Sequence, residues 1–160
     1  MQVLIMRHGD AVPDAASDAL RPLSARGVEE SRQMAFWLYD QGVAITRVLV
    51  SPYFRAQQTL STLCGILSLP DEEDWLPALT PGGDAAFVSD YLLALAGEGI
   101  ESVLIVSHLP LVGYLVAELS PQTGAPMFAT SAVACVTLDA QSGAGVFDWQ
   151  ISPSQLALKS

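Results

Sequence analysis

The sequence predicts an α/β protein of three layers, in which helices cover both faces of a mostly parallel central sheet. Three short apolar runs, at residues 3–5, 47–50 and 102–106, are typical of buried strands, and segments with helical spacing of apolar residues separate them. This alternation predicts parallel strands joined by crossover helices. Near the C-terminus, residues 132–138 and 146–151 flank a glycine-containing turn, which predicts an antiparallel hairpin added to the sheet.

The composition indicates one globular domain, which we expect to span residues 1–160. Hydrophobic residues make up 51% of the chain, enough to build a core. The formal net charge of −10 disfavours a nucleic-acid surface, because it would repel the phosphate backbone. Every basic residue except Lys159 is an arginine within the first 55 positions, so one local positive site can still form. Cys64 and Cys135 lack metal-type spacing, and we expect both to be packing residues.

The N-terminal part predicts a strand, a loop and a helix. The apolar run at 3–5 leads into Arg7-His8-Gly9, where the glycine permits a tight turn and a close approach of the backbone. Residues 10–21 are rich in Ala, Asp and Ser without a sustained period, which indicates a loop. Ser24 is a favourable N-cap for a helix that ends near Asp40. The apolar positions expected on its inner face are Val28, Ala35 and Leu38.

The second strand is followed by Ser51-Pro52, a pair typical of an N-cap and a first helical position. The helix predicted there runs to about Leu67 and places Arg55 in its first turn, near the end of the strand. The positions expected on its inner face are Ala56, Leu60, Leu63, Cys64 and Leu67.

The central part predicts a loop over 69–83, a helix over 84–96 and then the third strand, which delivers Ser107-His108 at its C-terminal end. Another helix follows, closed by Ser120-Pro121. The inner positions expected are Phe87, Val88, Tyr91, Leu92 and Leu95 in the first of these helices, and Leu111, Val112, Leu115, Val116 and Leu119 in the second.

Chemically active side chains follow each predicted strand: Arg7 and His8 the first, Arg55 the second and His108 the third. Ligands of open α/β sheets bind where the strands end, so these side chains are expected to meet there, and Arg21 can join them from the loop. Three arginines and two histidines predict a site for a tetrahedral dianion. A neutral His8 could attack phosphorus while the guanidinium groups neutralise the oxygens without a metal, and His108 would contact those oxygens from the other side.

A simpler interpretation is available for each residue taken alone. Arg7 could form a surface ion pair, His8 could be a hydrogen-bonded core histidine, and Arg21 could be a solvated loop residue. Ser51 could bind or orient a ligand, but its predicted capping role accounts for it.

Three motifs resemble those of the histidine phosphatase superfamily, the phosphoglycerate mutase-like enzymes. They are Arg7-His8-Gly9, the segment from Ser51 to Thr59, and Ser107-His108. Further matches at 6–11, 21–23, 79–81 and 107–115 are similar to the small bacterial phosphohistidine phosphatases, over nearly the full length. The resemblance implies a phosphoglycerate mutase-like fold, and no connection in this chain is long enough to add a cap domain over the site. It also implies removal of phosphate from a phosphohistidine-containing protein, such as the HPt domain of a phosphorelay or a phosphocarrier. In that reaction His8 would be the phosphorylated nucleophile, and Arg7, Arg21, Arg55 and His108 would bind the phosphate.

The chain departs from many superfamily members that cleave phosphate esters, which carry a carboxylic acid to protonate the leaving alcohol. Leu109 follows His108 here, and residues 75–80 contain no carboxylate. A phosphorylated imidazole can leave without such an acid, so a phosphoramidate substrate is favoured over an ester. Asp10 and Asp84 are the nearest candidates for a substitute acid, although solvation in loops is the simpler account of both.

Two other functions stay open at this point: a phosphomonoesterase or mutase acting on small metabolites, and a non-catalytic module that binds phosphohistidine. We expect the protein to be cytoplasmic, since no signal-peptide pattern opens the chain. We also expect it to be a monomer that needs no metal or cofactor. The apolar region 102–119 contains His108, Pro110, Gly113 and Glu118, which disfavours a membrane span.

Overall fold

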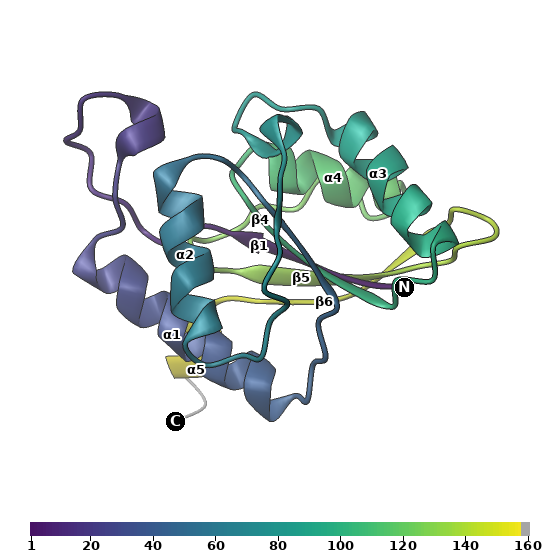
Figure 1. Cartoon of the computed structure of the whole chain (residues 1–160), viewed down its shortest axis with the longest axis horizontal. Coiled ribbons are helices and arrows are strands. Elements are labelled where there is room, and N and C mark those ends of the chain that lie inside the picture. The colour runs from purple at the N-terminus through teal and green to yellow at the C-terminus, as the bar shows by residue number, and fades with distance from the viewer. Residues whose placement is uncertain (158–160) are drawn as a thin grey trace.

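The structure is a computed structural model that describes residues 1–157 (Figure 1). Its six strands form one sheet of order β3-β2-β4-β1-β5-β6. The strands are β1 (Gln2–Arg7), β2 (Arg47–Val50), β3 (Asp74–Trp75), β4 (Ser102–Ser107), β5 (Val133–Leu138) and β6 (Gly145–Ile151). The α-helices are α1 (Ala25–Asp40), α2 (Phe54–Cys64), α3 (Ala85–Gly97), α4 (Leu111–Leu119) and α5 (Pro153–Ala157). Two 3-10 turns, η1 (Asp18–Leu20) and η2 (Pro77–Leu79), lie in connecting segments.

The sheet is parallel at its centre and antiparallel at one side, as predicted. Strand β4 pairs in parallel with both β1 and β2, and β2 pairs in parallel with β3. Strands β5 and β6 form the predicted hairpin, which joins the sheet through antiparallel pairing of β5 with β1. The α/β fold class is therefore confirmed.

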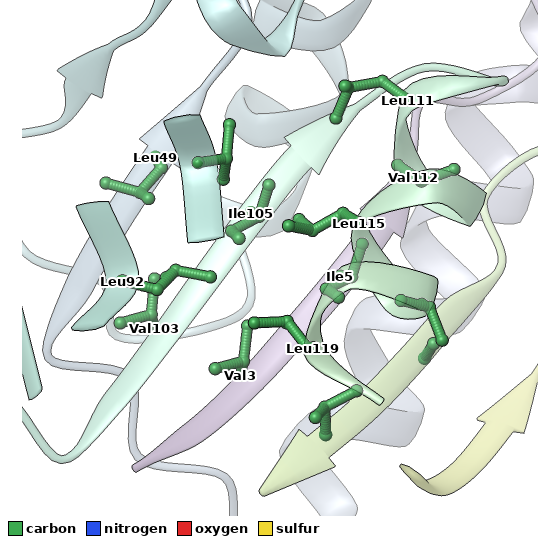
Figure 2. Packing of buried hydrophobic residues seen from close by; sticks show 14 of the residues in the cluster. Val3, Ile5, Leu49, Leu92, Val103, Ile105, Leu111, Val112, Leu115 and Leu119 are labelled. Atoms are coloured by element: carbon green, nitrogen blue, oxygen red, sulfur yellow. The ribbon is translucent and has the colours of Figure 1, made fainter. Parts of the chain in front are cut away.

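Helices cover both faces of the sheet, which explains why its strands are continuous apolar runs rather than alternating ones. Val3 and Ile5 of β1 face the core under α3 and α4 (Figure 2), whereas Leu4 and Met6 face the core under α1 and α2. All four side chains are fully buried. With both faces covered, a site must lie at the strand ends, and ligands of open α/β sheets bind at the C-terminal ones.

The first long helix begins after Ser24 as predicted, and the Ser24 hydroxyl accepts a hydrogen bond from the amide of Gly27 at 3.0 Å. Its buried stripe is Gly27, Ser31, Met34, Ala35 and Leu38. The assignment of Val28 to the inner face is wrong, since Val28 is 40% exposed. Gly27 takes the inner position because a Cβ there would lie 2.1 Å from the backbone oxygen of Asp10.

The prediction that Ser51 caps the next helix is also wrong. Helix α2 begins at Phe54 with Tyr53 in the cap position, and it ends at Cys64 rather than near Leu67. The Ser51 hydroxyl turns instead toward His108. Cys64 lies on the exposed side of α2, so only Cys135 is the packing residue that was expected.

The segment over 69–83 contains β3 and η2, and Phe87 of α3 is 50% exposed instead of inward. Phe87 lies in the first turn of α3, where the helix begins at the surface. None of the helices within residues 1–157 combines the length and apolar character needed to cross a bilayer.

Candidate active site

A pocket of about 230 Å³ lies at the C-terminal ends of β1 and β4 and the start of α2. Its lining residues are Arg7, His8, Asp10, Ala11, Asp18, Arg21, Arg55, Pro81, His108, Leu109 and Thr130. All five residues that the sequence predicted for the site are among them. The strands therefore bring together side chains that lie up to 101 positions apart in the chain.

His8 follows β1 directly and is only 7% exposed. Its Nδ1 lies 2.7 Å from the backbone oxygen of Gly9, and its Nε2 lies 3.2 Å from Nε of Arg55. A carbonyl only accepts and a guanidinium only donates, so the proton of neutral His8 is on Nδ1 and the lone pair is on Nε2. Burial lowers the pKa of His8 to about 4, with Arg55, Arg7 and Arg21 acting in the same direction against the hydrogen bond to Gly9.

Close backbone packing holds the turn after His8. A Cβ on Gly9 would lie 2.8 Å from the carbonyl oxygen of Gly27 and 2.9 Å from the Ser31 hydroxyl, so only glycine fits there. The amide of Gly9 donates to the Thr59 hydroxyl at 3.0 Å. The carbonyl of His8 accepts from the amide of Ser131 at 3.1 Å. These contacts hold the backbone of His8 and Gly9 in place and so fix the position of the imidazole.

Arg55 is 4% exposed and reaches the pocket from the first turn of α2. Asp18 of η1 holds its guanidinium: Nη1 donates to the backbone oxygen at 2.6 Å and Nη2 to the carboxylate at 3.2 Å. The same carboxylate accepts from Nη1 of Arg21 at 3.1 Å. The hydrogen bond from Arg21 is the main cause of a lowered pKa of Asp18; burial opposes it, and the hydrogen bond from Arg55 adds to the lowering.

Arg7 points into the same pocket from the last position of β1. Its Nη1 donates to the backbone oxygen of Phe128 at 2.8 Å, while its Nε is buried and has no partner among residues 1–157. Burial and the neighbouring Arg55 lower the pKa of Arg7, and Asp10 opposes them. Two arginines and an unpaired N–H around one point favour an anion there.

His108 follows β4 and is 1% exposed. Its ring lies 4.9 Å from that of His8 and 5.1 Å, edge-on, from that of Tyr53. Its Nε2 is 2.7 Å from the Ser51 hydroxyl, and its Nδ1 is buried without a partner in the described part of the chain. Burial lowers the pKa of His108 to about 2, and the neighbouring His8 and Arg55 add to the effect.

Two side chains that contact the site are not assigned to it by the sequence. Ser51 is a candidate to bind or orient a ligand there but is given a capping role, although its position at the end of β2 is itself a usable signal. Asp18 lies in a segment without periodicity, and nothing in its sequence surroundings marks it as a partner of Arg55. Of the two candidate acids, Asp84 caps α3 through the amide of Phe87 and does not line the pocket. Asp10 lines the pocket, and its carboxylate accepts from the Ser24 hydroxyl at 2.7 Å.

The arrangement combines a neutral imidazole, whose Nε2 lone pair faces Nε of Arg55, with several fixed cationic donors. It suits nucleophilic attack on a phosphoryl group that takes the place of that contact. Over the range 1–157, no group of three or more His, Cys, Asp or Glu side chains could hold a metal ion.

Comparison with known proteins gives a consistent answer, although no protein-family model matches the chain. The phosphohistidine phosphatase SixA of Escherichia coli K12 is 60% identical over 158 residues, which cover 99% of this chain and 98% of that protein. A SixA homolog from Haemophilus influenzae is 44% identical over 127 residues, covering 74% of this chain and 77% of its own.

A solved structure of the protein histidine phosphatase SixA complexed with tungstate has a TM-score of 0.96 to this chain at 61% identity. The match covers 98% of this chain and 99% of the other. The resemblance seen in the motifs is thereby confirmed. This chain belongs to the SixA family of phosphohistidine phosphatases, within the histidine phosphatase superfamily.

Proposed function

We propose that this protein hydrolyses phosphohistidine on a signalling protein, through an intermediate in which His8 itself carries the phosphoryl group. The observation that carries the proposal is the state of His8 in the pocket. Its Nδ1–H donates a hydrogen bond to the backbone oxygen of Gly9, so the lone pair is on Nε2, the atom that would attack phosphorus. This Nε2 now accepts a hydrogen bond from Nε of Arg55. With its pKa lowered to about 4, the imidazole is neutral and nucleophilic at neutral pH.

The reaction has two steps. In the first, Nε2 of His8 attacks phosphorus, the P–N bond of the substrate breaks, and its electron pair returns to the departing imidazole. Arg7, Arg21 and Arg55 neutralise the charge on the equatorial oxygens during this transfer. In the second step water attacks the phosphorus, the bond to Nε2 breaks, and inorganic phosphate leaves with His8 regenerated.

The carboxylates at the pocket favour a phosphoramidate over a phosphate ester. Asp18 is paired with Arg55 and Arg21, and these contacts keep it ionised. Asp10 accepts a hydrogen bond from the Ser24 hydroxyl at 2.7 Å. Both side chains are thus engaged by groups of the protein, and an alkoxide leaves poorly without an acid to protonate it. A phosphorylated imidazole that carries a proton on its other nitrogen leaves as a neutral ring.

A phosphorylated histidine side chain fits the pocket. A cavity of about 230 Å³ has room for a phosphoryl group and the imidazole that carries it, and the rest of a protein substrate would lie on the surface around it. We propose the HPt domain of a hybrid sensor kinase or a phosphocarrier as that substrate, and a cytoplasmic monomer free of metal as the enzyme. The related SixA structure binds tungstate, a tetrahedral oxyanion like phosphate, which supports an oxyanion site here.

Phosphate release from a phosphorylated HPt domain in the presence of EDTA tests the proposal. Wild type should release phosphate and become labelled on His8 by substrate carrying radioactive phosphorus. His8→Ala should release none, and Arg26→Ala serves as the matched control, because that arginine is exposed on α1. Binding without release by wild type would instead support a phosphohistidine-binding module. Faster turnover of p-nitrophenyl phosphate than of phosphohistidine would support a phosphomonoesterase.

A further inference from the structure

Ser51 lies behind the pocket, where β2 ends, and its side chain is fully buried. Its hydroxyl oxygen accepts a hydrogen bond from the amide of Tyr53 at 3.2 Å and lies 2.7 Å from Nε2 of His108. The hydroxyl therefore contacts a residue of the site and does not cap α2. Its effect on that residue depends on which of the two atoms donates the hydrogen.

The buried donors and acceptors decide between the two arrangements. A serine hydroxyl has one hydrogen and two lone pairs, and the amide of Tyr53 already uses one lone pair. If Nε2 of His108 donated, the Ser51 hydrogen would find no other acceptor within residues 1–157, which is unfavourable for a buried hydroxyl. If Ser51 donates to Nε2, the hydroxyl, the Tyr53 amide and Nε2 are all paired, and Nδ1–H of His108 is the one group without a partner among the described residues. The other arrangement leaves two such groups, the Ser51 hydrogen and the Nδ1 lone pair.

Donation by Ser51 determines whether Nδ1 of His108 carries a proton or a lone pair. A neutral imidazole that accepts at Nε2 carries its proton on Nδ1. This Nδ1 is buried and has no partner among the described residues, and His108 lines the pocket beside His8. An N–H there donates to a phosphoryl oxygen, whereas a lone pair there would repel it. The neutral ring is the relevant form, because burial and the positive neighbours oppose an imidazolium.

We propose that Ser51 is a positioning residue that holds His108 in the Nδ1–H tautomer, so that the neutral ring donates a hydrogen bond to a phosphoryl oxygen. The identity of the bound group rests on the proposed function, but the tautomer does not. Tyr53 supports the arrangement, since its amide orients the hydroxyl and its ring packs edge-on against His108.

Long-range 1H–15N correlation spectra of the histidine rings test the tautomer in the unmodified protein. The chain contains two histidines, so a His8→Ala variant leaves His108 alone and assigns its signals. We expect a protonated Nδ1 and a bare Nε2 at neutral pH, with Nδ1–H shifting when inorganic phosphate is added. A protonated Nε2, or rapid exchange between both tautomers, would overturn the proposal.

Two substitutions then separate positioning from simple structural support. Ser51→Ala removes the donor, so both tautomers of His108 should become populated. The binding of inorganic phosphate should weaken about ten-fold. Ser51→Thr keeps a hydroxyl and should preserve both properties. The proposal would be refuted if the Ser51→Ala variant kept both the His108 tautomer and the phosphate affinity of the wild-type protein. If wild type has the expected tautomer and binds phosphate but releases none from a phosphohistidine protein, the proposed function fails and this assignment stands.

Discussion

Acid should destabilise this protein through its two buried histidines. The pKa of His8 is lowered to about 4 and that of His108 to about 2, whereas both titrate near 6.5 in the unfolded chain. At pH values between the folded and the unfolded pKa, each histidine is protonated in the unfolded chain and neutral in the folded protein. Stability is therefore independent of these groups well above pH 6.5 and falls as the pH drops below it.

The magnitude follows from proton linkage. Each histidine that protonates only in the unfolded state lowers the free energy of unfolding by about 1.4 kcal/mol per pH unit. From pH 7 to pH 5, His8 and His108 together should remove about 4 kcal/mol, a large part of the 5 to 15 kcal/mol typical of a domain. Carboxylates contribute little in this window, because their unfolded pKa values lie near 4.

Urea unfolding at pH 7, 6 and 5 measures the effect, in buffers without phosphate, because an anion that binds the folded state alone would itself change the free energy of unfolding. His8→Ala and His108→Gln should each remove about half of the pH dependence, whatever they do to stability at pH 7. Equal free energies of unfolding at pH 7 and pH 5 in wild type would refute the reasoning. So would an unchanged slope in the variant that lacks both histidines.

Three further predictions concern packing and charge. Gly27→Ala should lower the free energy of unfolding by about 2 to 3 kcal/mol, because the added Cβ would lie 2.1 Å from the backbone oxygen of Asp10. A urea midpoint equal to that of wild type would contradict this. Arg55→Lys should weaken inorganic phosphate binding by about ten- to a hundred-fold in calorimetry, since lysine cannot contact both His8 and Asp18 with a planar fork. A thiol reagent should label Cys64 and spare Cys135 in the folded protein, because Cys135 is buried and burial raises its pKa to about 11; two labelled thiols per folded chain would disprove it.

The sequence alone determined the layers of the fold and the main members of the site. Runs that are apolar at every position, such as Val103 to Val106, form strands only when both faces are covered, so they indicate a parallel sheet between helices. Arg7, His8 and His108 directly follow such runs. Because parallel strands end at one edge, their convergence could be predicted without any contact being known.

The tertiary structure decided which atoms meet. The hydroxyl of Ser51 was free to cap α2 or to turn toward the sheet, and only the position of His108 on the neighbouring strand settles that choice. Asp18 reaches Arg55 across 37 positions of chain, from a loop without periodicity. The face of α1 was misjudged at Val28, because the choice of Gly27 depends on a backbone oxygen that approaches from another segment. Hydrogen-bond partners and close contacts between distant segments leave no periodic trace in a sequence, and they decide the protonation of each histidine in this site.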